Sequence, residues 1–209
     1  MGKRKILVLA PHTDDGELGC GATIAQHIDQ GDDVYYVAFS ICSRSLPEGW
    51  APDTLAKEVK EATKVLGLKS ENLILFDFDV RMFPEFRQPI LEEMVKLKKT
   101  INPDLVFVPS PTDLHQDHQV ISQEGLRAFK NVSILGYEMP WNNISFNTRA
   151  FNILDEKYIQ KKIDCLKMYK TQQHRTYLND NFIRSLATTR GVQIGAQYAE
   201  AFEVIRWIL

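Results

Sequence analysis

ILVLAPHTDDGELGCGATIAQHIDQ, residues 6–30, is the stretch of sequence that decides the fold. It opens with a continuous apolar run, Ile6–Ala10, which is typical of a strand buried on both faces. A polar loop follows, and a glycine-containing segment then leads into a helix predicted over Ala22–Gln30. The order of strand, loop and helix is the beginning of the unit from which parallel sheets are built.

The same order recurs along the chain. Apolar runs predict further strands, and amphipathic stretches between them predict helices. Short strands that lack polar alternation indicate a parallel sheet covered by helices on both faces. We therefore expect an α/β, Rossmann-like fold with a mostly parallel sheet, formed as a single domain over residues 1–209. The predicted strands are Val34–Phe39, Leu73–Phe76, Leu105–Val108, Ser133–Tyr137 and Phe202–Trp207, and the predicted helices are Thr54–Leu66, Arg87–Ile101, Gln119–Phe129, Ile159–Tyr169 and Asn181–Thr189.

Composition narrows the class of protein. The chain has 209 residues and 44% hydrophobic content, enough for one core. Its 25 Lys+Arg balance 27 Asp+Glu, which gives no support for a nucleic-acid or acidic-membrane partner. No apolar run approaches the roughly 20 residues of a membrane helix, and Ile6–Ala10 is too short for a signal peptide. Three widely spaced cysteines indicate reduced thiols, so we expect a cytoplasmic protein; they are Cys20, Cys42 and Cys165.

Side chains of the metal-binding type gather in two loops. Pro11–Glu17 follows the first predicted strand, and Asp113–His118 follows the fourth. In sheets of this kind ligands bind outside the carboxyl ends of the strands. Imidazole nitrogen and carboxylate oxygen suit zinc, and a catalytic zinc takes three protein ligands and one open position. Histidines that only cap or solvate a polar loop would explain either loop alone, but together the two loops favour a metal site.

The same residues carry a resemblance to a known family. His12–Ile24 resembles the opening motif of the PIG-L/LmbE-like family of zinc-dependent N-acetylglucosaminyl deacetylases, and Asp113–His118 resembles its second motif. Arg190-Gly191 and Gly195–Phe202 resemble its closing segment. The resemblance implies one Zn²⁺ per chain and assigns the site residues: His12, Asp15 and His118 as metal ligands, Asp14 as general base, His115 as the residue that stabilises the tetrahedral intermediate, and Asp117 as the carboxylate that orients His115.

Physical chemistry agrees with those roles. Zinc lowers the pKa of a water to about 7, so Asp14 can accept its proton at neutral pH. A carboxylate at Asp117 close to His115 would raise the pKa of the imidazole and keep it charged against the developing oxyanion. The sequence departs from the family at Thr13, where the family has Pro, and at Gly16, where it has Glu; Glu17 is a candidate substitute for that Glu.

Substrate contacts are less well marked. Arg81, Arg87 and Arg190 are candidates to meet a charged substrate group, with Arg190 favoured by its place in the closing segment. Asp79 is placed to bind sugar hydroxyls. Trp50 and Trp141 could stack on a sugar ring, although an aromatic side chain under a long loop more often fills a gap. We retain Asp79, Arg81 and Arg190 as candidate substrate-binding residues.

The leading hypothesis is hydrolysis of the N-acetyl group of a small amino sugar or sugar conjugate. One alternative is a zinc amidase for another amide, such as a thiol-sugar conjugate, and another is a non-catalytic sugar-binding module. A dinucleotide-binding Rossmann protein is disfavoured because Gly16-x-x-Gly19-x-Gly21 reverses the expected glycine spacing. Trp141–Phe146 offers an apolar edge for homo-oligomerisation. The identity of the substrate does not follow from residue types.

Overall fold

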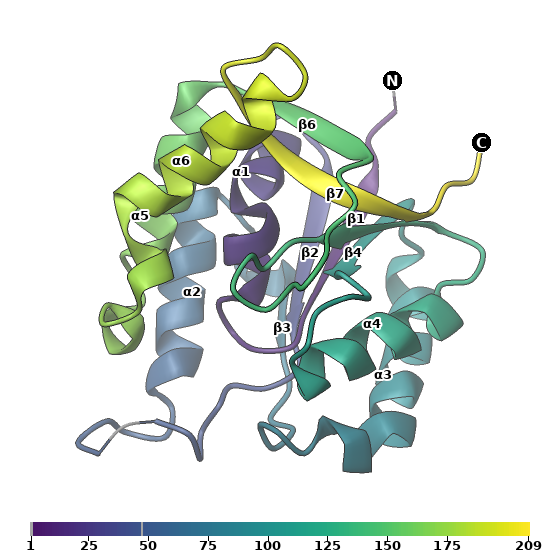
Figure 1. Cartoon of the computed structure of the whole chain (residues 1–209). Coiled ribbons are helices and arrows are strands. Elements are labelled where there is room, and N and C mark those ends of the chain that lie inside the picture. Colours follow the sequence, from purple (N-terminus) through teal and green to yellow (C-terminus); the bar gives the residue numbers. More distant parts are fainter. Residues whose placement is uncertain (1, 47) are drawn as a thin grey trace.

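The computed structural model describes residues 2–46 and 48–209. Its strands are β1 (Lys5–Ala10), β2 (Asp33–Ala38), β3 (Leu73–Leu75), β4 (Leu105–Pro109), β5 (Ser133–Tyr137), β6 (Ala150–Leu154) and β7 (Tyr198–Arg206). They form a seven-stranded sheet in the order β3-β2-β1-β4-β5-β7-β6 (Figure 1). Neighbours from β3 to β5 are parallel, and β7 is antiparallel to β5 and β6. The predicted α/β fold with a mostly parallel sheet is confirmed.

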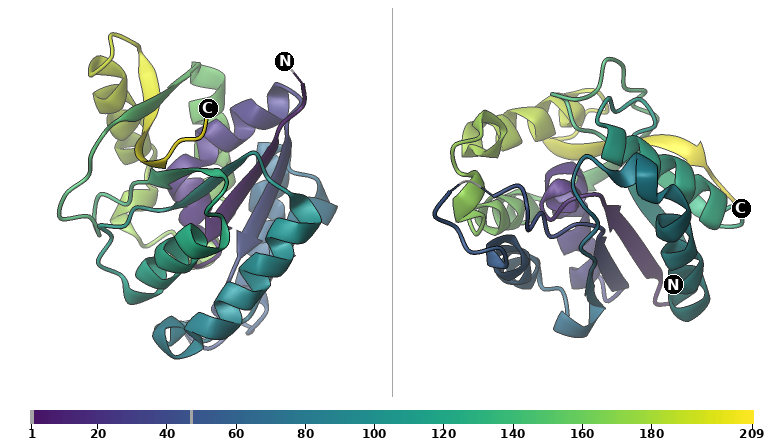
Figure 2. Two further views of the ribbon diagram at one scale, coloured as in Figure 1. Left: turned by 90° about the vertical axis from the view of Figure 1, so that its right-hand side faces the viewer. Right: turned by 90° about the horizontal axis from the view of Figure 1, so that it is seen from below.

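Helices cover both faces of the sheet. They are α1 (Asp15–Asp29), α2 (Thr54–Leu66), α3 (Arg87–Ile101), α4 (Gln116–Ala128), α5 (Glu156–Leu166) and α6 (Asp180–Val192). One face carries α1, α2, α5 and α6, and the other carries α3 and α4 (Figures 1 and 2). Within the described part of the chain, no helix is long and apolar enough to cross a membrane.

The central strand β1 shows why its sequence is uniformly apolar. Ile6, Leu7, Val8 and Leu9 are each fully buried. Ile6 and Val8 belong to the core beneath α1, whereas Leu7 and Leu9 belong to the core beneath α3 and α4. Side chains alternate between the two faces of a strand, so a strand buried on both faces needs an apolar residue at every position.

Two helices begin earlier than the sequence predicted, and both changes shape the site. α1 begins at Asp15 instead of Ala22, and it contains a break at Cys20, whose φ and ψ are −147° and 27°. α4 begins at Gln116 instead of Gln119, with His115 as its N-cap residue. Gly16, Gly19 and Gly21 lower the helix propensity of the segment before Ala22. Tertiary contacts, described below, nevertheless stabilise the helix there.

Differences elsewhere are confined to element ends and one edge strand. β7 begins at Tyr198 rather than Phe202, and α5 begins at Glu156 rather than Ile159. The sequence did not predict β6, a strand at the edge of the sheet with Ile153 61% exposed. An edge strand that is only half covered lacks the continuous apolar run by which the central strands were recognised.

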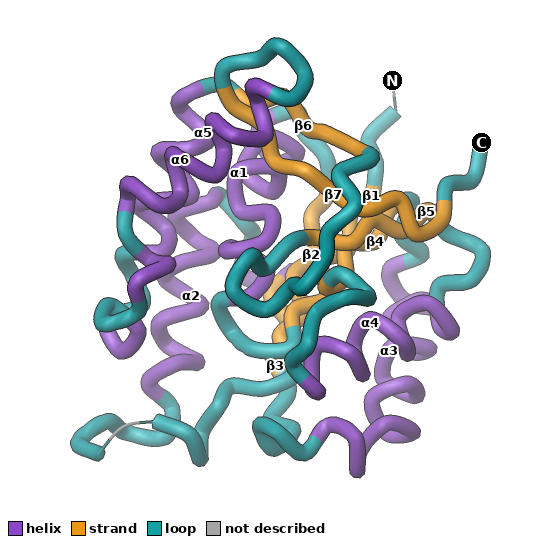
Figure 3. Tube along the Cα trace, in the orientation of Figure 1, coloured by secondary structure: helices purple, strands orange, loops and turns teal. Residues whose placement is uncertain are grey.

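The topology brings the two metal-type loops together. β1 pairs in parallel with β4, with Ile6 opposite Leu105. The loops that follow these two strands therefore leave the sheet side by side, where the chain reverses its direction of winding. The loop between β5 and β6 also joins this end, because the Leu114 N–H donates to the Asn142 carbonyl at 3.2 Å (Figure 3).

Candidate active site

His12 and Asp15 meet in the short turn between β1 and α1. The main-chain N–H of His12 donates to Oδ2 of Asp15 at 2.8 Å, and His12 Nδ1 lies 3.0 Å from the same oxygen. Asp15 is the first residue of α1, where the helix dipole favours a negative charge. The turn thus presents one nitrogen and one oxygen donor toward the same point.

His118 reaches the same carboxylate from the first turns of α4. Its Nε2 lies 3.2 Å from Asp15 Oδ2, and the donor atoms of His12, Asp15 and His118 all lie within 4.8 Å of one another. These are the three residues predicted to bind zinc. Separations of 3.0 and 3.2 Å are near the edge, roughly 3.3 Å, of a tetrahedron with metal–ligand distances of about 2.0–2.1 Å. The donor set and its spacing fit a zinc ion.

The second ring nitrogen of His12 and that of His118 each contact a carboxylate of their own. His118 Nδ1 lies 2.8 Å from Asp113, and His12 Nε2 lies 3.0 Å from Asp117. Both carboxylates are buried. Carboxylates in this position fix the orientation of histidine ligands in metal sites. The sequence analysis assigned no role to Asp113, although its place at the head of the second motif was an available signal.

The carboxylate of Asp117, to which the family resemblance assigned the orientation of His115, contacts His12. Its Oδ2 contacts His12 and accepts the Arg81 N–H at 2.6 Å, and its Oδ1 accepts the Phe83 N–H at 3.2 Å. The bond between residues 117 and 115 runs from the main chain: the Asp117 N–H donates to His115 Nδ1 at 3.2 Å. Because His115 caps α4, its side chain turns back to a free N–H of the first turn.

The electrostatics of the cluster favour a cation. Burial lowers the pKa of His12, but the Asp15 and Asp117 carboxylates outweigh burial and raise the pKa to about 9. Burial likewise lowers the pKa of His118, and Asp15 and Asp113 raise it to about 10. The carboxylates therefore create a negative environment in which positive charge is stabilised at the imidazoles, as a bound metal ion requires.

Asp14 lies beside this cluster with a different environment. Burial, followed by the charge of Asp15, raises the pKa of Asp14 to about 6. Its carboxylate forms no hydrogen bond to another of the described residues, and it lines the cavity that contains the metal-type residues. A carboxylate with a pKa near neutrality and free oxygens is suited to accept a proton.

The surroundings of His115 favour a neutral imidazole, whereas the sequence analysis expected a charged one. Burial, with help from His118 and His12, lowers the pKa of His115 to about 4. Geometry agrees, because a nitrogen that accepts the Asp117 N–H carries no proton of its own. The remaining hydrogen of the neutral ring is then on Nε2, which leaves His115 able to donate one hydrogen bond.

The chain is similar to proteins of one known family. A family model described as "PIG-L: GlcNAc-PI de-N-acetylase" matches residues 7–129, more than half of the chain. The chain belongs to the PIG-L family. An "uncharacterized deacetylase YaiS" from Escherichia coli is 31% identical over 175 residues, which cover 81% of this chain and 92% of that protein.

Two further proteins extend the comparison. A diacetylchitobiose deacetylase from Thermococcus kodakarensis is 28% identical, over 64% of this chain and 51% of that protein. The solved structure of an N,N'-diacetylchitobiose deacetylase from Pyrococcus horikoshii superposes with a TM-score of 0.80 at 22% identity. The match covers 97% of this chain and 84% of that one, so the two share a fold.

Packing explains why this PIG-L chain has glycine at position 16. A Cβ atom on Gly16 would lie 2.5 Å from Cε2 of Tyr36, so no larger residue fits there without a shift. The Tyr36 hydroxyl accepts the Gly16 N–H at 3.0 Å and lies 2.9 Å from the Thr13 carbonyl. Tyr36 therefore packs against the turn that carries His12 and Asp15. Its ring occupies the space that a side chain at Gly16 would need.

Glu17 completes that support from within the core. It is fully buried, and its carboxyl contacts the hydroxyls of Tyr36 and Tyr169. Burial, the largest influence, raises the pKa of Glu17 to about 8. A protonated Glu17 can donate to Tyr36, which frees the Tyr36 proton for the Thr13 carbonyl. Glu17 thus contacts the two tyrosines whose hydroxyls lie at the Thr13 carbonyl.

The cavity above the centre contains residues that the sequence did not single out. Arg175 and Tyr177, from the segment between α5 and α6, line it together with Arg81. Trp141 stacks on Tyr177, with ring centroids 3.9 Å apart. The side chain of Trp141 is still 38% exposed, and Ile144 in the same segment is 81% exposed. The segment from α5 to α6 carries no recognisable motif, so only the fold reveals its place.

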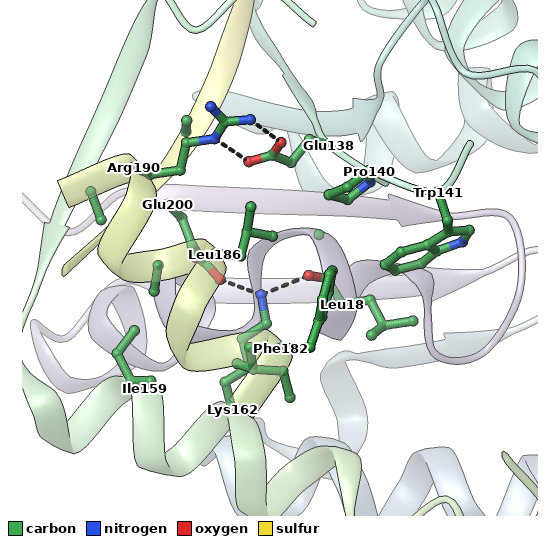
Figure 4. A pocket seen from close by; sticks show the side chains of 15 residues that line it. Leu18, Glu138, Pro140, Trp141, Ile159, Lys162, Phe182, Leu186, Arg190 and Glu200 are labelled. Atoms are coloured by element: carbon green, nitrogen blue, oxygen red, sulfur yellow. Dashed lines mark hydrogen bonds and ion pairs between the residues drawn. The ribbon is translucent and has the colours of Figure 1, made fainter. Parts of the chain in front are cut away.

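Of the three candidate substrate residues, only Arg81 lines this cavity. Asp79 pairs with Arg44 at 2.9 Å and lies outside the cavity lining. Arg190 forms two hydrogen bonds to Glu138, at 2.8 and 2.6 Å, in a neighbouring pocket (Figure 4). Asp79 and Arg190 thus have charged partners within the chain, and their contact with substrate stays a prediction from the sequence.

Proposed function

We propose that this chain is a single-domain, zinc-dependent N-deacetylase acting on a small N-acetylated amino sugar or sugar conjugate. The observation that carries the proposal is the convergence of His12, Asp15 and His118, with Asp14 beside them and His115 close by. Membership of the PIG-L family supports the reaction, and the similarity to a diacetylchitobiose deacetylase supports an N-acetylated sugar as substrate.

The chain's own residues account for the proton transfers of amide hydrolysis. His12, Asp15 and His118 would hold one zinc ion, which, when bound, lowers the pKa of water and polarises a carbonyl. Asp14 is ionised at neutral pH and accepts the proton of the attacking water. The Nε2–H of His115 donates to the acetyl oxygen as negative charge develops. Asp14 then gives the proton to the departing nitrogen, so that acetate and a free amine form.

Two alternatives share the scaffold. A zinc amidase for another amide, such as a thiol-sugar conjugate, would use the same groups in the same roles. A sugar-binding module without activity would need no base, so the free, partly buried carboxylate of Asp14 favours an enzyme. The cytoplasmic location, self-association and the lack of nucleic-acid and membrane partners stay predictions from the sequence.

Acetate release from purified protein tests the proposal. The panel contains N-acetylglucosamine, its nucleotide-linked form, diacetylchitobiose and an N-acetylated thiol-sugar conjugate, with zinc content measured in the same samples. We expect about one zinc per chain and acetate release from at least one amino sugar, which a chelator abolishes and added zinc restores. Asp14→Asn is the matched inactive control. A zinc-loaded wild type that cleaves none of the four would overturn the proposal.

A further inference from the structure

The helix that begins with Asp15 is broken after barely more than one turn. Cys20 has non-helical φ and ψ angles, and it separates the Asp15 turn from the rest of α1. A break in a helix leaves carbonyl and N–H groups without their usual partners, and buried main-chain groups of this kind must find others. Residues around Cys20 are almost entirely buried, so solvent cannot supply them.

One buried ion pair supplies these partners. Lys162 of α5 donates from Nζ to the Leu18 carbonyl at 2.6 Å and to Glu200 at 2.7 Å (Figure 4). Glu200 of β7 accepts the Ala22 N–H at 3.2 Å and the Thr23 N–H at 2.7 Å. The pair therefore bonds to the main chain on both sides of the break. Its two side chains are each only 7% exposed.

The stability of the fold does not by itself explain why Lys162 and Glu200 form a buried ion pair. Removing two charges from water is costly, and apolar side chains of similar size often serve a core as well or better. The hydrogen bonds of Lys162 and Glu200 instead go to main-chain groups that an unbroken helix would satisfy by itself. The pair is thus matched to the broken form of α1.

The break gives the first turn its own set of contacts. A Cβ on Gly19 would lie 2.2 Å from Cδ2 of Tyr137, so this turn packs directly against β5. Gly16 bonds to Tyr36 at the other end of the turn. Between these points the turn presents Asp15 to His12 and His118. Lys162 contacts the same turn at the Leu18 carbonyl, three residues from Asp15.

We propose that Lys162 and Glu200 are positioning residues that hold α1 in its broken form and so set the place of Asp15 at the metal centre. The inference deepens the proposed function and rests on it. It assigns no contact with substrate to either residue. Its consequence is that loss of the pair weakens zinc binding, although neither side chain is among the predicted ligands.

A neighbouring ion pair offers a matched control. Arg190 and Glu138 line the same pocket as Lys162 and Glu200 and are also largely buried (Figure 4). Their hydrogen bonds join each other and Gln193, and none goes to α1. The test compares Lys162→Met/Glu200→Gln with Arg190→Met/Glu138→Gln. Zinc affinity is measured by competition with a chelating indicator, and amide hydrogen exchange is measured for Leu18, Ala22 and Thr23.

We expect zinc affinity to fall by roughly 10- to 100-fold in the Lys162/Glu200 variant, the range found for groups that support metal ligands. Exchange at the three amides should accelerate, and both properties should stay at wild-type values in the Arg190/Glu138 variant. Glu200→Gln alone keeps one acceptor for α1 and should fall between, so it replaces the double variant if that fails to fold.

Unchanged zinc affinity in the folded Lys162/Glu200 variant, or an equal loss in both double variants, overturns the inference. A wild type that binds zinc and releases acetate would leave the proposed function standing in that case. A wild type that binds no zinc would instead refute the proposed metal site and, with it, the assigned purpose of the pair. The two failures are therefore distinguished by the wild-type measurement.

Discussion

The carboxylate of Asp117 lies 3.0 Å from Nε2 of His12, on the side of the ring opposite the nitrogen that faces Asp15. Asp117→Asn should therefore act on the metal. We expect zinc affinity to fall by roughly 10- to 100-fold, because the ring of His12 loses its charged support. Competition with a chelating indicator measures the change. If zinc affinity is preserved and only the pH profile moves, Asp117 serves His115 after all.

If His115 acts as a neutral donor, the pH dependence of activity should have one rising limb. Activity should rise as Asp14 loses its proton near pH 6, where burial has raised its pKa, and should then stay level through neutral pH. His115→Ala should lower kcat by roughly 10²–10³-fold, as loss of one oxyanion donor does. The rise in activity near pH 6 should stay at the same pH. Profiles of kcat against pH for both proteins check this. A high-pH limb that disappears in His115→Ala would show that a charged His115 is required.

The elements that carry the site were predictable because their signals are local. Ile6–Ala10 is apolar at every position, and the residues that follow it include three chemically distinctive side chains close together. The same holds for Leu105–Val108 and Asp113–His118. Since parallel neighbours bring their carboxyl ends together, one topological assumption predicted that the two loops would meet, and the family resemblance assigned His12 and His118 as the residues that meet there.

The remaining features depend on pairs that are distant in sequence. The contact between Asp117 and His12 was not predicted, because it joins residues 105 apart in sequence, and α4 begins early and turns His115 toward the main chain. Lys162 meets Leu18 across 144 residues, and no local pattern marks either as a partner. Such contacts follow from packing between layers, which residue types alone do not determine.

Glu17 provides a test of the support beneath the turn. Burial raises its pKa from about 4.5 to about 8, so between these values the folded protein holds a proton that the unfolded chain releases. Stability from this group is complete below about pH 4.5 and is lost as pH rises to about 8. Glu17→Gln should flatten the fall in melting temperature across this range, measured in the presence of a chelator. Glu58→Gln, at a buried acceptor for Thr171, is the control and should keep the wild-type fall in melting temperature across this range.

Arg81 combines a strained backbone with a place in the cavity. Its φ is 68°, a region that costs little for glycine and more for other residues. Arg81→Gly should leave the free energy of unfolding unchanged or raise it by up to about 1 kcal/mol. KM should rise most for substrates with an anionic group, which the guanidinium would bind. A loss of stability with an unchanged KM would mean that Arg81 is structural. Arg149→Gln, at an exposed arginine outside the cavity lining, controls for lost charge.

Asp14 and Asp15 are adjacent residues of identical chemistry, and the structure places them in different surroundings. Asp15 receives His12 and His118 at 3.0 and 3.2 Å, and their charges hold the pKa of Asp15 well below its usual range, although burial opposes this. Asp14 has no such partners, and its pKa is raised to about 6. Asp15→Asn should therefore lose zinc, because a neutral amide is a poorer ligand than a carboxylate in the same place.

Asp14→Asn should keep zinc and lose turnover by roughly 10²–10⁴-fold, the contribution of a positioned general base. Elemental analysis and acetate release, performed on the same preparations, separate the two effects. Adding zinc in excess should restore part of the activity of Asp15→Asn and none of that of Asp14→Asn, since the second variant lacks a proton acceptor and not a ligand. Loss of metal from Asp14→Asn, together with its retention in Asp15→Asn, would reverse the two assignments and require the base to be sought on the other side of the cluster.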